Sequence, residues 1–194
     1  MNIVERVKHL ILKPRQEWRV IDGETYTVQG LYTQYVMLLA AIPAVCGFIG
    51  FSLVGIGVFG STYRVPIAAG VAHMVVQYLM SLGMVYVFAL IIDALAPSFG
   101  SQKNFNQAIK VAAFMPTAAW VAGVFLIIPA LGIIGQLLGL YSLYLLFLGL
   151  PILMKTPEDK SIPYVVVVII AAIVLAVVLT VIVGLTMPGP VRGF

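Results

Sequence analysis

The stretch Val111–Met154 reads VAAFMPTAAWVAGVFLIIPALGIIGQLLGLYSLYLLFLGLPILM and contains no Asp, Glu, Lys or Arg. As one helix it would be about 66 Å long, roughly twice the ~30 Å thickness of a bilayer core. Proline lacks a backbone N–H and glycine adopts unusual dihedral angles, so the chain can turn at Pro129-Ala130-Leu131-Gly132. The stretch therefore predicts two membrane-spanning helices joined by a short turn.

Three further apolar stretches, Tyr35–Leu53, Val65–Ile92 and Tyr164–Leu185, also lack charged residues. A single Asp, Lys or Arg at the centre of a bilayer costs about 2.5–3.5 kcal/mol on insertion scales, so a membrane would select this pattern whereas water would not. We therefore predict an all-α polytopic membrane protein. Its five transmembrane helices should form a bundle and lie at about residues 33–53, 65–92, 108–128, 132–152 and 163–185.

The composition agrees with this class of protein. Hydrophobic residues make up 62% of the 194 residues and charged residues 9%, compared with about 25% charged residues in ordinary globular domains. The net charge is +4, but the basic residues do not gather on one soluble face, so we expect the lipid bilayer and not nucleic acid as the partner. The single cysteine, Cys46, excludes an intrachain disulfide.

The orientation follows from lysine and arginine, which are enriched in cytoplasmic loops. With the N-terminus inside, the cytoplasmic side would carry most of the basic residues. These are Arg6, Lys8, Lys13, Arg15, Arg19, Lys103, Lys110, Lys155 and Lys160. Arg64 and Arg192 would lie outside. We therefore expect a cytoplasmic N-terminus and a short outer tail at residues 188–194.

Residues 1–30 are predicted to form a cytoplasmic N-terminal segment that begins with an amphipathic helix over residues 1–12. Apolar side chains at helical spacing share one face of this helix: Ile3, Val4, Val7, Leu10 and Ile11. Pro14 should end the helix. Such a helix either lies in the membrane interface or docks a partner, and Trp18 suits a position at the headgroup level.

Polar side chains are few within the spans. His73, Gln77 and Ser81 recur every four residues and so share one face of the second span, and Gln136 lies in the fourth. They could form interhelical hydrogen bonds, worth about 0.6 kcal/mol each on average. Alternatively they could line a polar path for a small molecule or ion, with His73 able to change its charge near neutral pH.

Small residues in the fourth span suggest close helix packing. Gly135 and Gly139 form a small-xxx-small pair, and Gly132 extends the same smooth surface. The pattern leaves open whether this surface contacts another helix of the same chain or a second copy in a homo-oligomer.

Enzymatic patterns are absent from the sequence. It contains no H-E-x-x-H motif, no pair of intramembrane aspartates, no Ser–His dyad with an oxyanion loop and no P-loop. Two histidines and one cysteine leave few metal ligands. We therefore expect no enzymatic activity, no cofactor and no metal site.

The chain resembles bacterial inner-membrane members of the Yip1-domain family. The similar segments are LKPRQEW at residues 12–18, FNQA at 105–108, Pro116, PALG at 129–132, Tyr141-x-x-Tyr144 and Gly149-Leu150. The resemblance implies a five-helix transmembrane domain over residues 31–187 and a location in the bacterial inner membrane. Only Pro14 and Trp18 match family-pattern positions that could contact a partner.

Eukaryotic members of that family are linked to Rab GTPases, but this chain lacks their long cytosolic N-terminal region, so that role is not transferred. Two hypotheses for function remain. The first is a non-enzymatic scaffold that binds a membrane or cytoplasmic protein. The second is a small transporter or channel component that moves a small molecule or ion past the polar residues of the second span.

Overall fold

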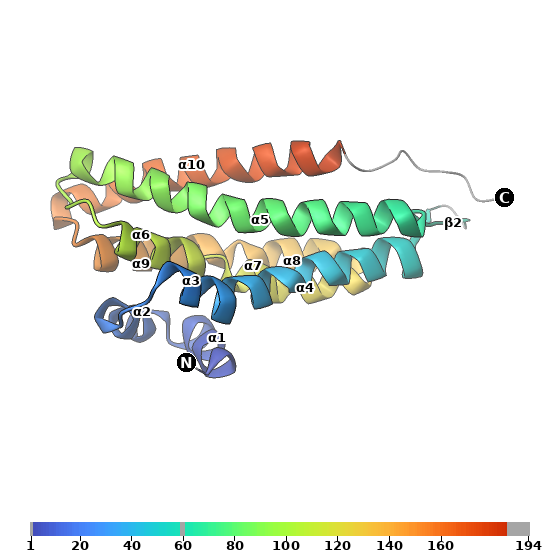
Figure 1. Cartoon of the computed structure of the whole chain (residues 1–194), viewed down its shortest axis with the longest axis horizontal. Coiled ribbons are helices and arrows are strands. Elements are labelled where there is room, and N and C mark those ends of the chain that lie inside the picture. The colour runs from blue at the N-terminus through green and yellow to red at the C-terminus, as the bar shows by residue number, and fades with distance from the viewer. Residues whose placement is uncertain (1, 59–60, 186–194) are drawn as a thin grey trace.

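A computed structural model of the chain describes residues 2–58 and 61–185, and the predicted outer tail at residues 188–194 lies outside this part. The molecule is a bundle of long helices that run along its longest axis (Figure 1). Five helical segments are long and apolar enough to cross a membrane: Val28–Val54, Ile67–Phe99, Phe105–Ile127, Pro129–Met154 and Glu158–Gly184. The predicted all-α class and the number of spans are therefore confirmed.

Two short helices precede the bundle, α1 (Ile3–Leu12) and α2 (Pro14–Gly23). The first and second spans are built from α3 (Val28–Leu31), η1 (Tyr32–Val36), α4 (Met37–Phe48), η2 (Ile49–Val54), α5 (Ile67–Leu95) and η3 (Ala96–Phe99). The remaining spans are built from α6 (Phe105–Phe114), α7 (Thr117–Ala122), η4 (Gly123–Ile127), η5 (Pro129–Leu131), α8 (Gly132–Gly139), α9 (Tyr141–Met154) and α10 (Glu158–Gly184).

The third span is the central element of the bundle and α10 is peripheral. Buried residues make up 61% of the most apolar segment of the third span, compared with 11% of that of α10. Pro116 divides the third span into α6 and α7, because proline cannot continue the backbone hydrogen-bond ladder. Gly123, which follows α7, lies so close to Pro43 of α4 that a Cβ atom would fall 2.6 Å from the proline Cβ.

A short hairpin connects the first two spans. It is antiparallel and consists of β1 (Ile56–Val58) and β2 (Ser61–Tyr63). Gly55 enters the hairpin at φ +90°, a conformation that favours glycine. The hairpin lies at the opposite end of the bundle from the α9–α10 connection (Figure 1).

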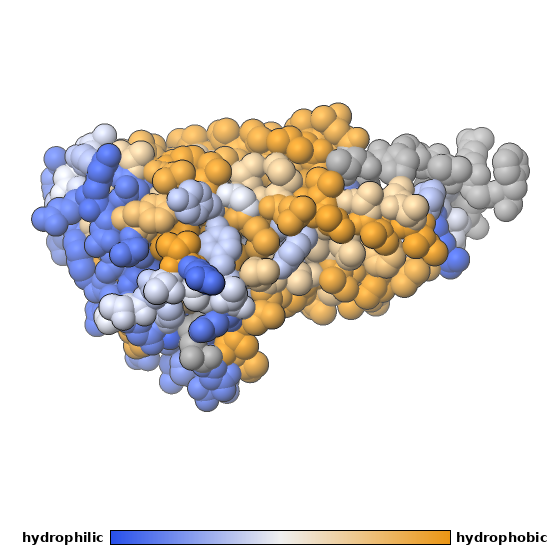
Figure 2. Space-filling model, in the orientation of Figure 1, coloured by the Kyte–Doolittle hydropathy of each residue, from blue (hydrophilic) through white to orange (hydrophobic). Residues whose placement is uncertain are grey.

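Apolar and hydrophilic surfaces occupy different parts of the molecule. On the face that it draws, Figure 2 shows an apolar band along the bundle and a concentration of hydrophilic residues at one end, next to the N-terminal helices. Exposed apolar residues on α10 include Ile170, Ile173 and Val177, each more than half exposed. Such a surface is stable in contact with lipid chains and not in contact with water.

Candidate functional site: the N-terminal platform

The helices α1 and α2 form a compact pair, which we call the N-terminal platform (residues 3–23). Asn2 begins α1 by accepting a hydrogen bond from the Val4 amide at 3.1 Å. The helix ends at Leu12, and Pro14 occupies the first turn of α2, where its missing N–H has no intrahelical partner to lose. The prediction that the first helix ends before Pro14 is confirmed, whereas α2 itself was not predicted.

Trp18 attaches the platform to the bundle. Its side chain is fully buried, with the indole against Gly149 of α9 and in an edge-to-face arrangement with Phe114 of α6 at 6.4 Å between ring centroids. A Cβ atom at position 149 would lie 2.6 Å from Trp18 Cδ2, so only glycine leaves room for the ring. The sequence suggested a headgroup anchor or a partner contact at Trp18, but in this structure the ring packs inside the protein.

A buried charge cluster lies between the two helices of the platform and the start of the first span. We call Arg6, Glu17, Glu24 and Tyr26 the Arg6 cluster. Arg6 donates to Glu17, and its Nη2 donates to the two carboxylate oxygens of Glu24 at 2.8 and 2.6 Å. Arg6 and Glu17 are 6% and 7% exposed, and buried charges are tolerated only when they are paired and hydrogen-bonded in this way.

The charge states follow from these contacts. Burial alone would raise the pKa of Glu24, but hydrogen bonds from Tyr26 and Arg6 outweigh burial and hold the pKa below its usual value. Burial disfavours the charge on Arg6, but its hydrogen bond to Glu24 and the nearby carboxylates outweigh that effect and raise its pKa. Burial and the hydrogen bond to Glu24 also raise the pKa of Tyr26. The cluster therefore holds a positive guanidinium against the ionised carboxylate of Glu24.

Side chains of the bundle bind the carboxyl end of each platform helix. Lys110 of α6 is 4% exposed, and its Nζ donates to the backbone carbonyls of Ile21, Asp22 and Glu24 at 2.8, 3.2 and 3.0 Å. Tyr141 of α9 donates to the Ile11 carbonyl at 2.9 Å. The last carbonyls of a helix have no intrahelical donors, so these contacts satisfy exposed acceptors and orient both helices.

The side chain of Asp22 provides a further connection between α2 and the bundle. Gln107 Nε2 of α6 donates to Asp22 Oδ1 at 3.2 Å, and Lys155, which follows α9, forms an ion pair with the same carboxylate. The platform is consequently attached to α6 and α9 at several points. Sequence reasoning missed the Arg6 cluster and Lys110, although a lysine at the start of an apolar span was a signal that it has a buried partner.

The predicted polar-path residues lie apart from the platform. His73, Gln77 and Ser81 are partly buried along α5, where His73 has the Val183 backbone as a hydrogen-bond partner and Ser81 donates to the Tyr78 carbonyl at 2.7 Å. Gln136 is exposed on α8, which packs against α7 and η4. Within residues 2–58 and 61–185 no hydrogen bond joins Gln136 to the three residues on α5.

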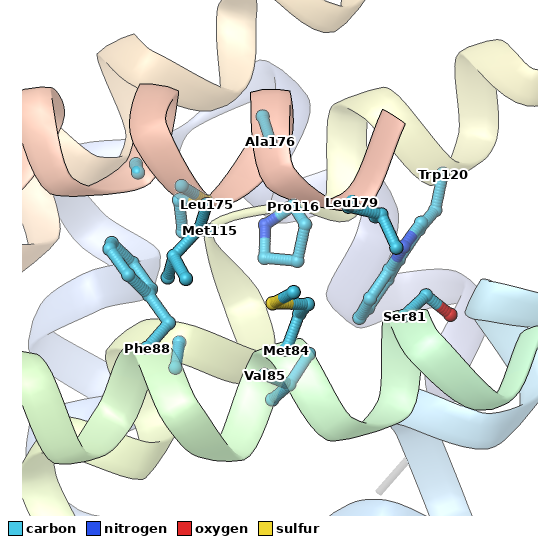
Figure 3. Close-up of a pocket in the computed structure, with 12 residues that line it drawn as sticks. Ser81, Met84, Val85, Phe88, Met115, Pro116, Trp120, Leu175, Ala176 and Leu179 are labelled. Carbon is cyan, nitrogen blue, oxygen red and sulfur yellow. The ribbon is translucent and has the colours of Figure 1, made fainter. Parts of the chain in front are cut away.

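Ser81 borders an apolar hollow of about 170 Å³ between α5, the α6–α7 break and α10. Figure 3 shows Pro116 near its centre, with Met84 and Phe88 from α5 and Leu175 and Leu179 from α10 around it. Apart from the Ser81 hydroxyl and the indole N–H of Trp120, its lining side chains are apolar. The hollow therefore offers little stabilisation to an ion or to a chain of water molecules.

The predicted packing glycines face other helices of the same chain. A Cβ atom at Gly135 would lie 2.9 Å from the Ala122 carbonyl oxygen, and one at Gly139 would lie 3.6 Å from Ala119 Cβ. A Cβ atom at Gly132 would be 3.7 Å from Leu126. Of the two contacts that the sequence left open, the structure contains the one within the chain, because α7 and η4 pack on this smooth surface.

Among the described residues, no group of three or more His, Cys, Asp or Glu could hold a metal ion.

Comparisons with known proteins give the family of this fold. The chain matches the Yip1 domain over residues 8–180. It is 27% identical over 159 residues to the inner membrane protein YohC of Escherichia coli strain K12. The aligned residues cover 80% of this chain and 82% of YohC. The same values hold for YohC of Escherichia coli O6:H1 strain CFT073. No solved structure matches the chain. Because the matched residues include most of the platform, the first four spans and most of the fifth, the chain is an integral membrane protein that belongs to the Yip1 domain family.

Proposed function

We propose that this protein is a non-enzymatic scaffold of the bacterial inner membrane that binds a protein partner through its N-terminal platform. The name of the related YohC proteins supports the location. The observation that carries the proposal is the attachment of a two-helix platform to the bundle by Trp18, the Arg6 cluster and Lys110. The bundle anchors the platform in the membrane and holds it in one orientation.

The outer face of the platform has the composition of a binding surface. Its apolar residues Val4, Leu12 and Val20 are 70%, 65% and 50% exposed, and they lie among exposed charged residues such as Lys8 and Lys13. A surface that is already ordered loses less conformational entropy on binding than a flexible segment does. This arrangement supports partner binding at the platform rather than along the spans.

The proposed orientation places the platform in the cytoplasm. The platform, the α5–α6 connection and the α9–α10 connection carry basic residues, and all three lie toward the end of the bundle opposite the hairpin (Figure 1). Arg64 lies beside the hairpin at the other end. This distribution supports a cytoplasmic N-terminus under the positive-inside rule.

The test of the scaffold function uses substitutions at the surface. Removing residues 1–18 would also remove Trp18 and leave a hole beside Gly149, so loss of binding by that truncation would not identify the contact surface. We would instead compare the wild type with Val4→Asn/Leu12→Asn by native mass spectrometry after gentle extraction from the native membrane. The control is Ile56→Asn, an exposed apolar residue of the hairpin at the opposite end.

The expected result is a second protein bound in a fixed ratio to the wild type and to Ile56→Asn, and lost from Val4→Asn/Leu12→Asn. Equal binding by all three proteins would show that the platform is not the contact surface. A wild-type protein that carries no second protein would contradict the scaffold function itself.

Transport of a small molecule is the second candidate, supported by the position of Ser81 at the edge of the hollow in Figure 3 and by His73 two turns away on the same helix. If this function is correct, His73→Ala will change flux across proteoliposomes while the protein remains folded. Unchanged flux would remove the residue on which the transport function depends.

A further inference from the structure

A groove lies between α2, α9 and the start of α10 at the hydrophilic end of the bundle. Its volume is about 510 Å³. Its lining includes Arg15 and Arg19 of α2, Phe147 and Ile152 of α9, and Ile162 of α10. The groove is distinct from the hollow in Figure 3 and from the Arg6 cluster.

The two arginines of the groove have no partner within the described chain. Arg15 and Arg19 are four residues apart and therefore share one face of α2. Neither guanidinium forms an ion pair or a hydrogen bond with residues 2–58 or 61–185, unlike Arg6 and Lys155. Both side chains are exposed, so their donors are available for an external acceptor.

The charge of the groove favours an anion. Among the described residues that line it, Glu158 is the only acidic one, and it forms no ion pair with either arginine. Two guanidinium groups against one carboxylate leave a net positive charge. The planar donor fork of arginine matches the geometry of a phosphate group, with which it forms charge-assisted hydrogen bonds.

The opposite part of the groove is apolar and continues into the surface that faces lipid. Phe147 and Ile162 are 47% and 65% exposed, and Ile170 on the same helix as Ile162 is 55% exposed. The groove lies at the carboxyl end of α9 and the amino end of α10, where the apolar band meets the hydrophilic end. Phospholipid headgroups occupy this depth in a bilayer.

We propose that this groove binds an anionic glycerophospholipid. The phosphate contacts Arg15 and Arg19, and an acyl chain lies along the exposed apolar residues of α9 and α10. A soluble phosphate would use only the arginines and leave Phe147 and Ile162 uncovered, so the combination of charge and apolar surface favours a lipid. Basic pockets between helices at a membrane surface bind anionic headgroups elsewhere. The site goes beyond the scaffold function and does not depend on a protein partner.

The main test measures lipid retention by native mass spectrometry. The purified full-length protein is reconstituted into nanodiscs of phosphatidylglycerol or phosphatidylcholine and then released. We expect phosphatidylglycerol to be retained at least about tenfold more than phosphatidylcholine, and Arg15→Gln/Arg19→Gln to lose this preference. The control Lys8→Gln/Lys13→Gln removes the same charge from exposed positions outside the groove and should keep the preference.

Equal retention of both lipids by the wild type, or an unchanged preference in Arg15→Gln/Arg19→Gln, would overturn the proposal. The same loss in the control variant would also overturn it, because the effect would then reflect net charge alone.

A second pair of measurements does not depend on the folding of the arginine variant. Ile162→Trp fills the groove and keeps both arginines, and it should reduce phosphatidylglycerol retention to a similar degree. Phosphatidylglycerol with a photoreactive acyl chain should label the wild type on α9 and α10 near Phe147 and Ile162. Full retention by Ile162→Trp, or labelling spread evenly over all the spans, would contradict the site.

Discussion

At the scale of single residues, Gly149 leaves space for the Trp18 indole because glycine has no side chain. The indole occupies the space that any Cβ atom at position 149 would need. These residues are far apart in the sequence, and each is unremarkable alone: a tryptophan beside a membrane suggests an interface anchor, and a glycine in a span suggests helix packing. Their complementarity is visible only when α2 lies on α9.

Gly149→Ala should therefore destabilise the protein by about 1–3 kcal/mol, because the new methyl group displaces a ring that is enclosed on all sides. Thermal unfolding in detergent would show a lower Tm. Gly83→Ala is the matched control, since a Cβ atom at Gly83 meets no other atom within 4 Å. That change should leave the Tm equal or slightly higher, because alanine favours helix more than glycine does. A Tm for Gly149→Ala as high as that of the control would contradict the packing.

Glu24 should make stability depend on pH in the acidic range. Its pKa in the folded protein lies below the value of 4.5 expected for the unfolded chain, so the unfolded state takes up a proton first as the pH falls. The stabilisation by Glu24 is therefore present above about pH 4.5 and decreases below it. Thermal unfolding across this range should show a smaller loss of Tm for Glu24→Gln than for the wild type. Identical pH profiles would show that Glu24 is not paired with Arg6.

At the scale of elements, α2 depends on the bundle for its carboxyl end. The Lys110 ammonium group donates hydrogen bonds to three backbone carbonyls at this end. The Asp22 carboxylate of α2 accepts a hydrogen bond from Gln107 and forms an ion pair with Lys155. A helix of ten residues is only marginally stable alone in water, so these contacts and the burial of Trp18 account for its order.

Lys110→Met should loosen α2 and leave the distant helices unchanged. Methionine fills the buried volume but donates no hydrogen bond, so three carbonyls lose their donor. Each buried carbonyl left without a donor lowers the free energy of unfolding by about 1–3 kcal/mol. Hydrogen exchange followed by mass spectrometry should become faster in residues 14–24 and stay constant in α10. Lys103→Met, an exposed lysine in the preceding loop, provides the control. Faster exchange throughout the bundle would mean that Lys110 supports the whole fold and not α2 specifically.

At the scale of the whole molecule, the separation of charge along the long axis determines how the protein can sit in a membrane. The apolar band cannot be exposed to water, and the hydrophilic end with the platform cannot enter the bilayer (Figure 2). Two orientations satisfy both conditions, and the positive-inside rule favours the proposed one, in which the platform is cytoplasmic. The proposed partner surface and the lipid groove then face the same compartment.

Single cysteines test this orientation directly in a Cys46→Ala background. An impermeant maleimide added to spheroplasts should label Thr62→Cys in the hairpin, and it should label Lys103→Cys only after the membrane is opened. Both positions are exposed in the structure, so protection at either one must come from the membrane. The reverse pattern would place the platform outside and refute the proposed topology.

The order of residues along the chain is enough to predict the helical class, the five spans and the end of the first helix, because a bilayer penalises every buried charge and every unpaired backbone group regardless of which helices are neighbours. Only the packed molecule reveals the placement of Trp18 against Gly149, the pairing of Arg6 with Glu17 and Glu24, and the groove beside Arg15 and Arg19. These features join elements distant in the sequence, so they depend on the shape and charge of the packed neighbours rather than on the local pattern of residues.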